Sequence, residues 1–248
     1  GTARTDFLGD VAEAVGARVT QGSLPPPAAI VEALAPVARG HHLSLWSPVA
    51  AEQALFRRIG ADGGLPPVRG DSLAVTNVNA GGNKVDWFLR RTSDYVAEVD
   101  GPDGRVTGAL TVTLRNEAPP AGLPAYVIGG PFATPIDPAG SNRTYLSVYS
   151  PLGLAGATLD GRPVPVESAR EVGRNVYSLF LVVPPGGTRT LTFELSGEVP
   201  GDGPYRLDWH AQPLVVPEVV SARVTSGDRA LVVRHAGPLA GDETLPAR

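Results

Sequence analysis

The sequence contains neither cysteine nor methionine. Without cysteine the chain has no disulfide, no thiolate metal site and no cysteine nucleophile. The absence of cysteine suits an extracytoplasmic protein that avoids stray oxidation, but many cytosolic proteins share it, so it leaves the compartment open. Because methionine is also absent, the chain cannot begin at its own initiator methionine, and we expect a processed product or an excised fragment.

Long apolar runs and clusters of positive charge are absent as well. No run approaches the roughly 18 apolar residues of a membrane helix, so we expect no membrane-spanning segment in this chain. The net charge is −4, and the basic residues form no run longer than a pair. Aromatic residues make up only 6% of the chain and do not interleave with the basic ones, which argues against nucleic-acid binding.

Glycine and proline, by contrast, are abundant, with 30 and 25 residues that stand between short apolar runs. This composition predicts many short strands joined by turns, and therefore a mainly β protein. Apolar residues at helical spacing predict three helices near the N-terminus, over residues 7–19, 27–39 and 50–59. Residues 41–46 are predicted to form a short strand, so that residues 1–70 read as an α/β segment, the end of a truncated larger domain.

From residue 71 onward the pattern becomes extended. Residues 85–99 predict a long strand that turns back at residues 101–104 into a second strand over residues 106–114. A Pro/Gly-rich connection over residues 118–142 follows, either an interdomain crossing or a functional loop. Further strands are predicted over residues 144–149, 157–159, 175–183, 189–195, 205–209, 219–224 and 230–235. This spacing favours an antiparallel immunoglobulin-like β-sandwich over residues 71–248.

The polar stretch over residues 77–86 has a Gly-Gly centre, three asparagines and the chain's only lysine. The glycines permit positive φ and expose successive N–H groups, the lysine supplies a point charge, and the asparagines orient an anionic or hydroxyl-rich ligand. The alternative is a glycine hairpin in which the asparagines close the turn and the aspartate neutralises the lysine. The candidate ligand-binding residues are Asn79, Gly81, Gly82, Asn83, Lys84 and Asp86.

Other candidate chemistry is sparse. His41 and His42 are neighbours on a predicted strand, so they point to opposite faces and cannot chelate one metal. His210 and His235 stand far apart, with no carboxylate partner evident from spacing. We therefore predict no catalytic residue, no metal site and no cofactor.

Four aromatic residues suggest an alternative function for the predicted sheets. An exposed row of them would be typical of a carbohydrate-binding module, although the same spacing also fits inward core positions. The four candidates are Trp87, Tyr95, Tyr145 and Tyr149.

Several motifs stand in a fixed order along nearly the whole chain. They are His41-His42-Leu43 with Trp46-Ser47, Glu52-Gln53, and the segments 79–86, 116–119, 122–127 and 142–145. Together they resemble the DUF 4012 family, whose most specific motif here is the asparagine-glycine loop. The resemblance implies an actinobacterial protein that is secreted or membrane-anchored and often encoded beside exopolysaccharide genes. It implies no established activity, and it places the start of this chain inside the family's pattern.

A second resemblance rests on fewer residues. Arg4, Asp6 and Phe7 before a helix are similar to a segment of the LytR-CpsA-Psr glycopolymer transferases, which pass polyprenyl-phosphate-linked glycans to the cell wall. This chain has Gly9-Asp10-Val11 where that family continues with arginine and glutamine. We expect a non-catalytic structural or interaction region of a bacterial cell-envelope protein, with a surface glycan or another envelope protein as partner. The C-terminal part of such a transferase and a carbohydrate-binding module are the alternatives.

Overall fold

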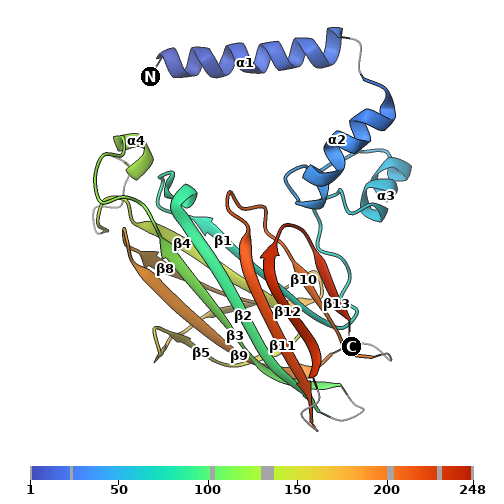
Figure 1. The fold of residues 1–248 in the computed structure, drawn as a ribbon, viewed down its shortest axis with the longest axis vertical. Coiled ribbons are helices and arrows are strands. Elements are labelled where there is room, and N and C mark those ends of the chain that lie inside the picture. Colours follow the sequence, from blue (N-terminus) through green and yellow to red (C-terminus); the bar gives the residue numbers. More distant parts are fainter. Residues whose placement is uncertain are drawn as a thin grey trace.

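The computed structural model describes residues 2–22, 25–100, 104–129, 137–199, 204–227 and 231–246. Two β-sheets pack face to face, and three N-terminal helices lie beyond one end of them (Figure 1). The helical elements are α1 (Thr2–Gln21), α2 (Pro27–Arg39), α3 (Ala50–Arg58), the short α4 (Ala125–Ile128) and the 3-10 turn η1 (Val85–Phe88). The described chain is thus mainly β with a helical N-terminal segment, which confirms the coarse prediction.

The strands divide into a six-stranded and a seven-stranded sheet. The first has the order β13-β10-β1-β4-β8-β7, formed by Glu243–Pro246, Arg206–His210, Asp71–Asn79, Asn142–Ser150, Arg174–Val183 and Glu167–Glu171. The second has the order β12-β11-β2-β3-β9-β5-β6, formed by Leu231–Leu239, Glu218–Ser226, Leu89–Asp100, Arg105–Asn116, Thr188–Glu198, Gly153–Leu159 and Arg162–Pro163.

Two strand pairs are parallel, which corrects the prediction of a purely antiparallel sandwich. β1 runs parallel to β10, and β2 runs parallel to β11. The other strand pairs of the described residues are antiparallel. Parallel partners require a long crossover connection, whereas turn residues in a sequence reveal only local hairpins.

The predicted strands overlap the observed ones. The hairpin of β2 and β3 is present, and the seven later runs fall on β4, β5 and β8 to β12, apart from residue 230, which lies outside the described residues. Asp160 and Gly161 form the turn that joins β5 to β6, with φ values of 51° and 76°. Positive φ at both positions is the geometry of a two-residue type I′ hairpin.

Two local predictions are wrong. Residues 41–46 form no strand, because they cross from α2 to α3 and no strand of the described residues pairs with them. Leu45 N–H bonds to Ala61 O at 2.7 Å. The predicted strand over residues 85–99 begins instead with η1, and only from Leu89 does it pair with β3. The Pro/Gly-rich connection contains α4, while its residues 130–136 lie outside the described part.

One apolar core lies between the sheets. Its largest fully buried side chains include Trp209 of β10, Phe193 of β9 and Tyr95 of β2. Along β2 every second side chain from Leu89 to Ala97 is buried, as expected for a strand with one face on the core. Two of those inward positions hold polar residues, Arg91 and Ser93, so the core becomes polar toward one end of the sheets.

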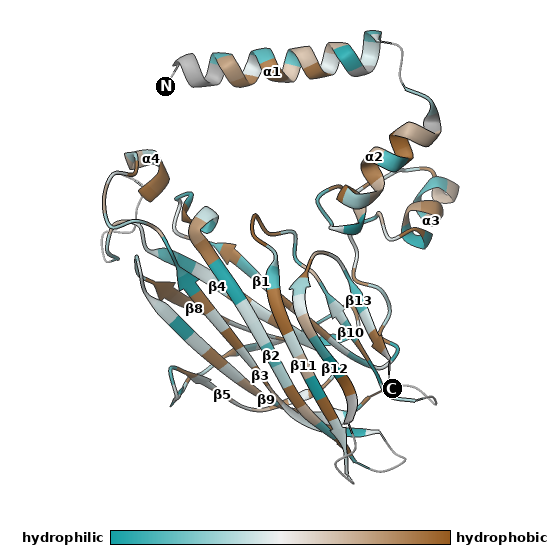
Figure 2. Cartoon of the chain, viewed as in Figure 1, coloured by the Kyte–Doolittle hydropathy of each residue, from teal (hydrophilic) through white to brown (hydrophobic). Residues whose placement is uncertain are grey.

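The N-terminal helices keep apolar side chains at their surface. Phe7 and Val15 of α1 are 64% and 59% exposed, and Figure 2 shows hydrophobic residues along α1 and α2. None of the described helices is both long and apolar enough to cross a membrane. Arg4 lies in α1, but its side chain is outside the described part, so the resemblance that rests on it stays untested.

Candidate functional site

The asparagine-glycine loop follows β1 and is closed by its own side chains. Asn79 Oδ1 accepts the Gly81 N–H at 2.7 Å, and Asn79 Nδ2 donates to Asn83 Oδ1 at 2.8 Å. Asn83 Nδ2 donates in turn to Ser141 O at 2.9 Å. A Cβ at Gly81 would lie 3.0 Å from the Asn83 amide nitrogen, so glycine fits the close approach of these two amides. The asparagines are thus used to shape the loop and to fix it against the segment before β4.

The charged residues of this loop do not form the expected pair. Lys84 is exposed, and none of the ion pairs among the described residues joins it to Asp86. Asp86 Oδ1 instead accepts a hydrogen bond from Asn142 Nδ2 at 2.7 Å. Gly82 has φ of 63°, and the space between the loop and residues 137–143 is only about 10 Å³. A ligand would have to contact the outer surface of the loop, and ligand binding by these six residues stays a prediction.

A buried polar cluster escaped prediction from the sequence. Arg174 is 1% exposed and donates from Nη2 to His210 Nε2 at 3.2 Å and to Pro66 O at 3.0 Å. The other ring nitrogen, His210 Nδ1, donates to Asp242 at 2.8 Å, and His41 Nε2 bonds the second oxygen of this carboxylate at 2.8 Å. The carboxylate partner of His210 is 32 residues away in the chain, which no local pattern reveals.

This cluster holds elements together and leaves no free base. Burial lowers the pKa of Arg174. Burial also raises the pKa of Asp242, but the hydrogen bond and charge of His210 outweigh it, so this pKa lies below its usual value of 3.8. Both ring nitrogens of His210 have partners within the protein, Arg174 at Nε2 and Asp242 at Nδ1, so neither is open to a substrate. The contacts of His41 and Pro66 tie the segments on either side of α3 to the sheet edge.

The outer face of the six-stranded sheet carries a group of aromatic side chains. Val78, Tyr145 and Phe180 are cross-strand neighbours in one row over β1, β4 and β8. The rings of Tyr145 and Phe180 lie with centroids 4.5 Å apart, tilted by 46°. Phe180 is 57% exposed and Val78 62% exposed, so this row is open to solvent. The named residues, with Tyr149, Glu167 and Glu171, form what we call the aromatic face.

Two carboxylates of the edge strand β7 fix the tyrosines of this face. Tyr145 Oη donates to Glu167 at 2.6 Å, and Tyr149 Oη donates to Glu171 at 3.0 Å. The hydrogen bond to Glu167 raises the pKa of Tyr145, and burial followed by the bond to Glu171 raises that of Tyr149. The rings are therefore held in place before any ligand arrives, with acceptor oxygens beside them.

The four aromatic candidates lie in different places in the structure. Tyr145 and Tyr149 share the aromatic face, two side-chain positions apart on β4. Trp87 is 63% exposed but belongs to η1, and Tyr95 is a fully buried core residue whose hydroxyl bonds Asp71. Phe180, which completes the face, was not among the candidates, because residues 179–183 are all apolar and no alternation shows which face Phe180 lies on.

Comparisons with known proteins assign no family to the chain. No protein-family model matches the sequence, and no curated protein matches it. Native leukotriene A4 hydrolase from Saccharomyces cerevisiae is similar in structure, with 9% identity over 64% of this chain and 29% of that chain, at a TM-score of 0.37. An M1 zinc metallopeptidase from Deinococcus radiodurans is similar with 14% identity over 64% of this chain and 38% of that chain, at a TM-score of 0.29. Similarity at this level carries no argument about function.

Proposed function

We propose that this chain is a non-catalytic interaction region of a secreted or membrane-anchored bacterial cell-envelope protein, and that its aromatic face binds surface polysaccharide. The envelope location comes from the resemblance to the DUF 4012 family. An immunoglobulin-like arrangement of the two sheets belongs to the same proposal. The single core between two facing sheets supports an immunoglobulin-like arrangement, whereas the parallel pairs β1–β10 and β2–β11 differ from that arrangement.

The observation that carries the proposal is the open row of Val78, Tyr145 and Phe180. An exposed group of large apolar side chains on a sheet face marks a place where something else packs. Sugar rings have apolar C–H faces that stack on aromatic rings, and their hydroxyl groups need acceptors. Glu167 and Glu171 provide such acceptors within the same face. Rings that are held in place beside carboxylates suit the repeated sugar rings of an extended glycan.

The test compares two exposed aromatic residues of similar accessibility. Phe180→Ala removes the most open ring of the aromatic face, whereas Trp87→Ala removes an equally exposed ring elsewhere. Affinity for purified surface polysaccharide, measured by affinity electrophoresis or calorimetry, is expected to fall roughly five- to tenfold for Phe180→Ala. Trp87→Ala is expected to bind as the unmodified chain does. Equal losses in the two variants, or no binding by the unmodified chain to any envelope glycan, would overturn the proposal.

A further inference from the structure

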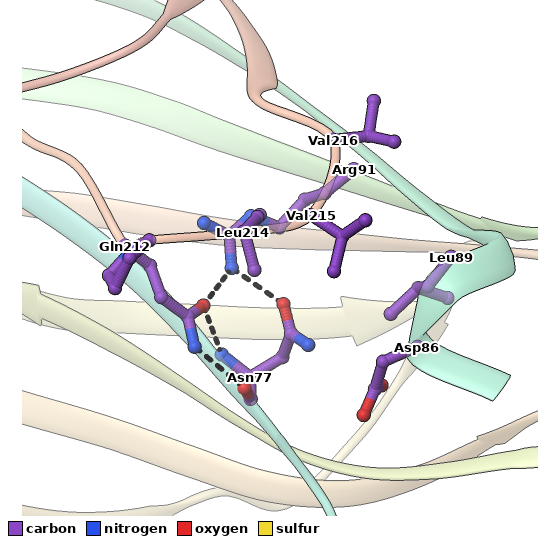
Figure 3. A pocket seen from close by; sticks show the side chains of 9 residues that line it. Asn77, Asp86, Leu89, Arg91, Gln212, Leu214, Val215 and Val216 are labelled. Atoms are coloured by element: carbon purple, nitrogen blue, oxygen red, sulfur yellow. Dashed lines mark hydrogen bonds between the residues drawn. The ribbon is translucent and has the colours of Figure 1, made fainter. Parts of the chain in front are cut away.

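A second feature of the molecule is a cavity of about 180 Å³ near the start of β2, which we call the Arg91 cavity (Figure 3). It lies where the inward side chains of β1 and β2 become polar, and the loop after β10 forms its other wall. Its lining residues are Asn77, Asp86, Leu89, Arg91, Gln212, Pro213, Leu214, Val215 and Val216. One end of the core is therefore hollow instead of packed.

The polar wall of the cavity is a fixed network. Arg91 Nη1 donates to Asn77 Oδ1 and to Gln212 Oε1, both at 2.7 Å, as the dashed lines in Figure 3 show. Gln212 also holds both backbone groups of Asn77, accepting from its N–H at 2.9 Å and donating to its carbonyl at 2.8 Å. Arg91 Nη2 donates to Glu218 at 2.8 Å, and Ser93 Oγ donates to the second oxygen of Glu218. The guanidinium is thus oriented by three partners, from β1, β11 and the loop, and Ser93 of β2 holds the third of them, Glu218.

One donor of this network is unused. Arg91 is 3% exposed, and its Nε–H has no acceptor among the described residues. A buried donor without an acceptor is costly, so such groups in native proteins usually meet a ligand or water. Arg91 also lines the cavity, so a small shift of its side chain would bring this N–H to an oxygen acceptor inside the cavity.

Charge and size restrict the ligand. The positive charge of Arg91 is balanced by Glu218, and Asp86 adds a further carboxylate to the lining, so an anion would meet net repulsion. The remaining wall is apolar, formed by Leu89 and the side chains at 214–216. At about 30 Å³ of liquid volume per water molecule, the cavity corresponds to about six waters, which is the size of a ligand with fewer than about ten non-hydrogen atoms.

We propose that the Arg91 cavity binds a small neutral molecule in which one carbonyl or hydroxyl oxygen is joined to a branched apolar body. The oxygen accepts the Arg91 Nε–H, and the apolar body packs against Leu89 and Val215. This site is separate from the aromatic face, which lies on the outer side of the six-stranded sheet.

The experiment uses 3-methylbutanamide as the probe and its anion-bearing counterpart 3-methylbutanoate as the control. The Nε–H of arginine gives its own signal in nitrogen–proton NMR spectra, so the Arg91 signal reports directly on the proposed contact. The amide is expected to shift this signal saturably, with a dissociation constant on the order of 1 mM. The anion is expected to bind at least about tenfold more weakly.

Two variants make the outcome decisive. Val215 is 55% exposed, so Val215→Trp fills the mouth of the cavity from its solvent side without touching the network. Val219→Trp introduces the same residue at a 49% exposed position of β11 outside the cavity. Binding is expected to be lost in the first and kept in the second. An Arg91 signal that does not move, equal binding of amide and anion, or unchanged binding by Val215→Trp would each overturn the proposal.

Discussion

The ion pair between Arg91 and Glu218 is buried, and its burial determines how much stability the protein should lose when the pair is broken. The two side chains are 1% and 2% exposed, and the charged atoms lie 2.8 Å apart. With an effective dielectric constant of about 20, their gross attraction is about 332/(20 × 2.8), or about 6 kcal/mol. Glu218→Gln removes the negative charge but keeps an oxygen acceptor, so about half of this attraction is retained. We expect the free energy of unfolding to fall by about 3 kcal/mol, the lower end of the cost of breaking a buried pair.

The matched control is the exposed pair of Arg105 and Glu198. Its side chains are 62% and 68% exposed and 3.5 Å apart, so Glu198→Gln is expected to cost less than about 1 kcal/mol. Urea denaturation followed by circular dichroism measures both variants. If Glu218→Gln and Glu198→Gln cost the same, the reasoning about the buried network is refuted. The double variant Arg91→Met with Glu218→Leu leaves no unpaired charge, but Asn77 Oδ1 and Ser93 Oγ lose their partners, so it is expected to regain only part of the lost stability.

Two further predictions concern the loop and a buried carboxylate. Asn83→Ala is expected to lower the free energy of unfolding by about 1–2 kcal/mol, because the side chain of Asn83 no longer bonds Asn79 and Ser141. Lys84→Ala is expected to change it by less than about 0.5 kcal/mol. Equal effects of the two substitutions in a denaturation series would contradict this. Burial raises the pKa of Asp71 above its usual 3.8, although hydrogen bonds from the hydroxyl of Tyr205 and from two other donors lower it. The stability that Asp71 contributes is therefore present below pH 3.8 and is lost as the pH rises through the folded pKa. Asp71→Asn should therefore gain stability relative to the unmodified chain as the pH rises through this window, and parallel pH profiles of unfolding would speak against the raised pKa.

Local sequence patterns predicted the strands that alternate or carry apolar runs, such as β4, β8 and β9. They missed β7, since all five of its residues are exposed on a sheet edge and no alternation remains to be read. The type I′ turn at Asp160 and Gly161 was predictable because both residues tolerate positive φ. Such signals act over a few residues, and therefore report hairpins well.

The parts that could not be predicted depend on long-range pairing. The parallel pairs β1–β10 and β2–β11 join strands more than 120 residues apart, as in Asp71 with Leu207 and Thr92 with Val219. The Arg91 network likewise draws Asn77, Gln212 and Glu218 from distant segments. The asparagine-glycine loop was found because its unusual composition is local, but whether its side chains close the loop or face a ligand depends on Ser141 and Asn142, far along the chain.

The aromatic face can be tested most directly by NMR mapping of bound glycan. Purified surface-polysaccharide fragments would be titrated into the isotope-labelled chain, with amide and aromatic signals followed together. We predict saturable shifts that centre on Tyr145, Tyr149 and Phe180 and leave Trp87 unchanged. Shifts confined to the asparagine-glycine loop, or a spectrum that no envelope glycan changes, would contradict a glycan-binding role for this face.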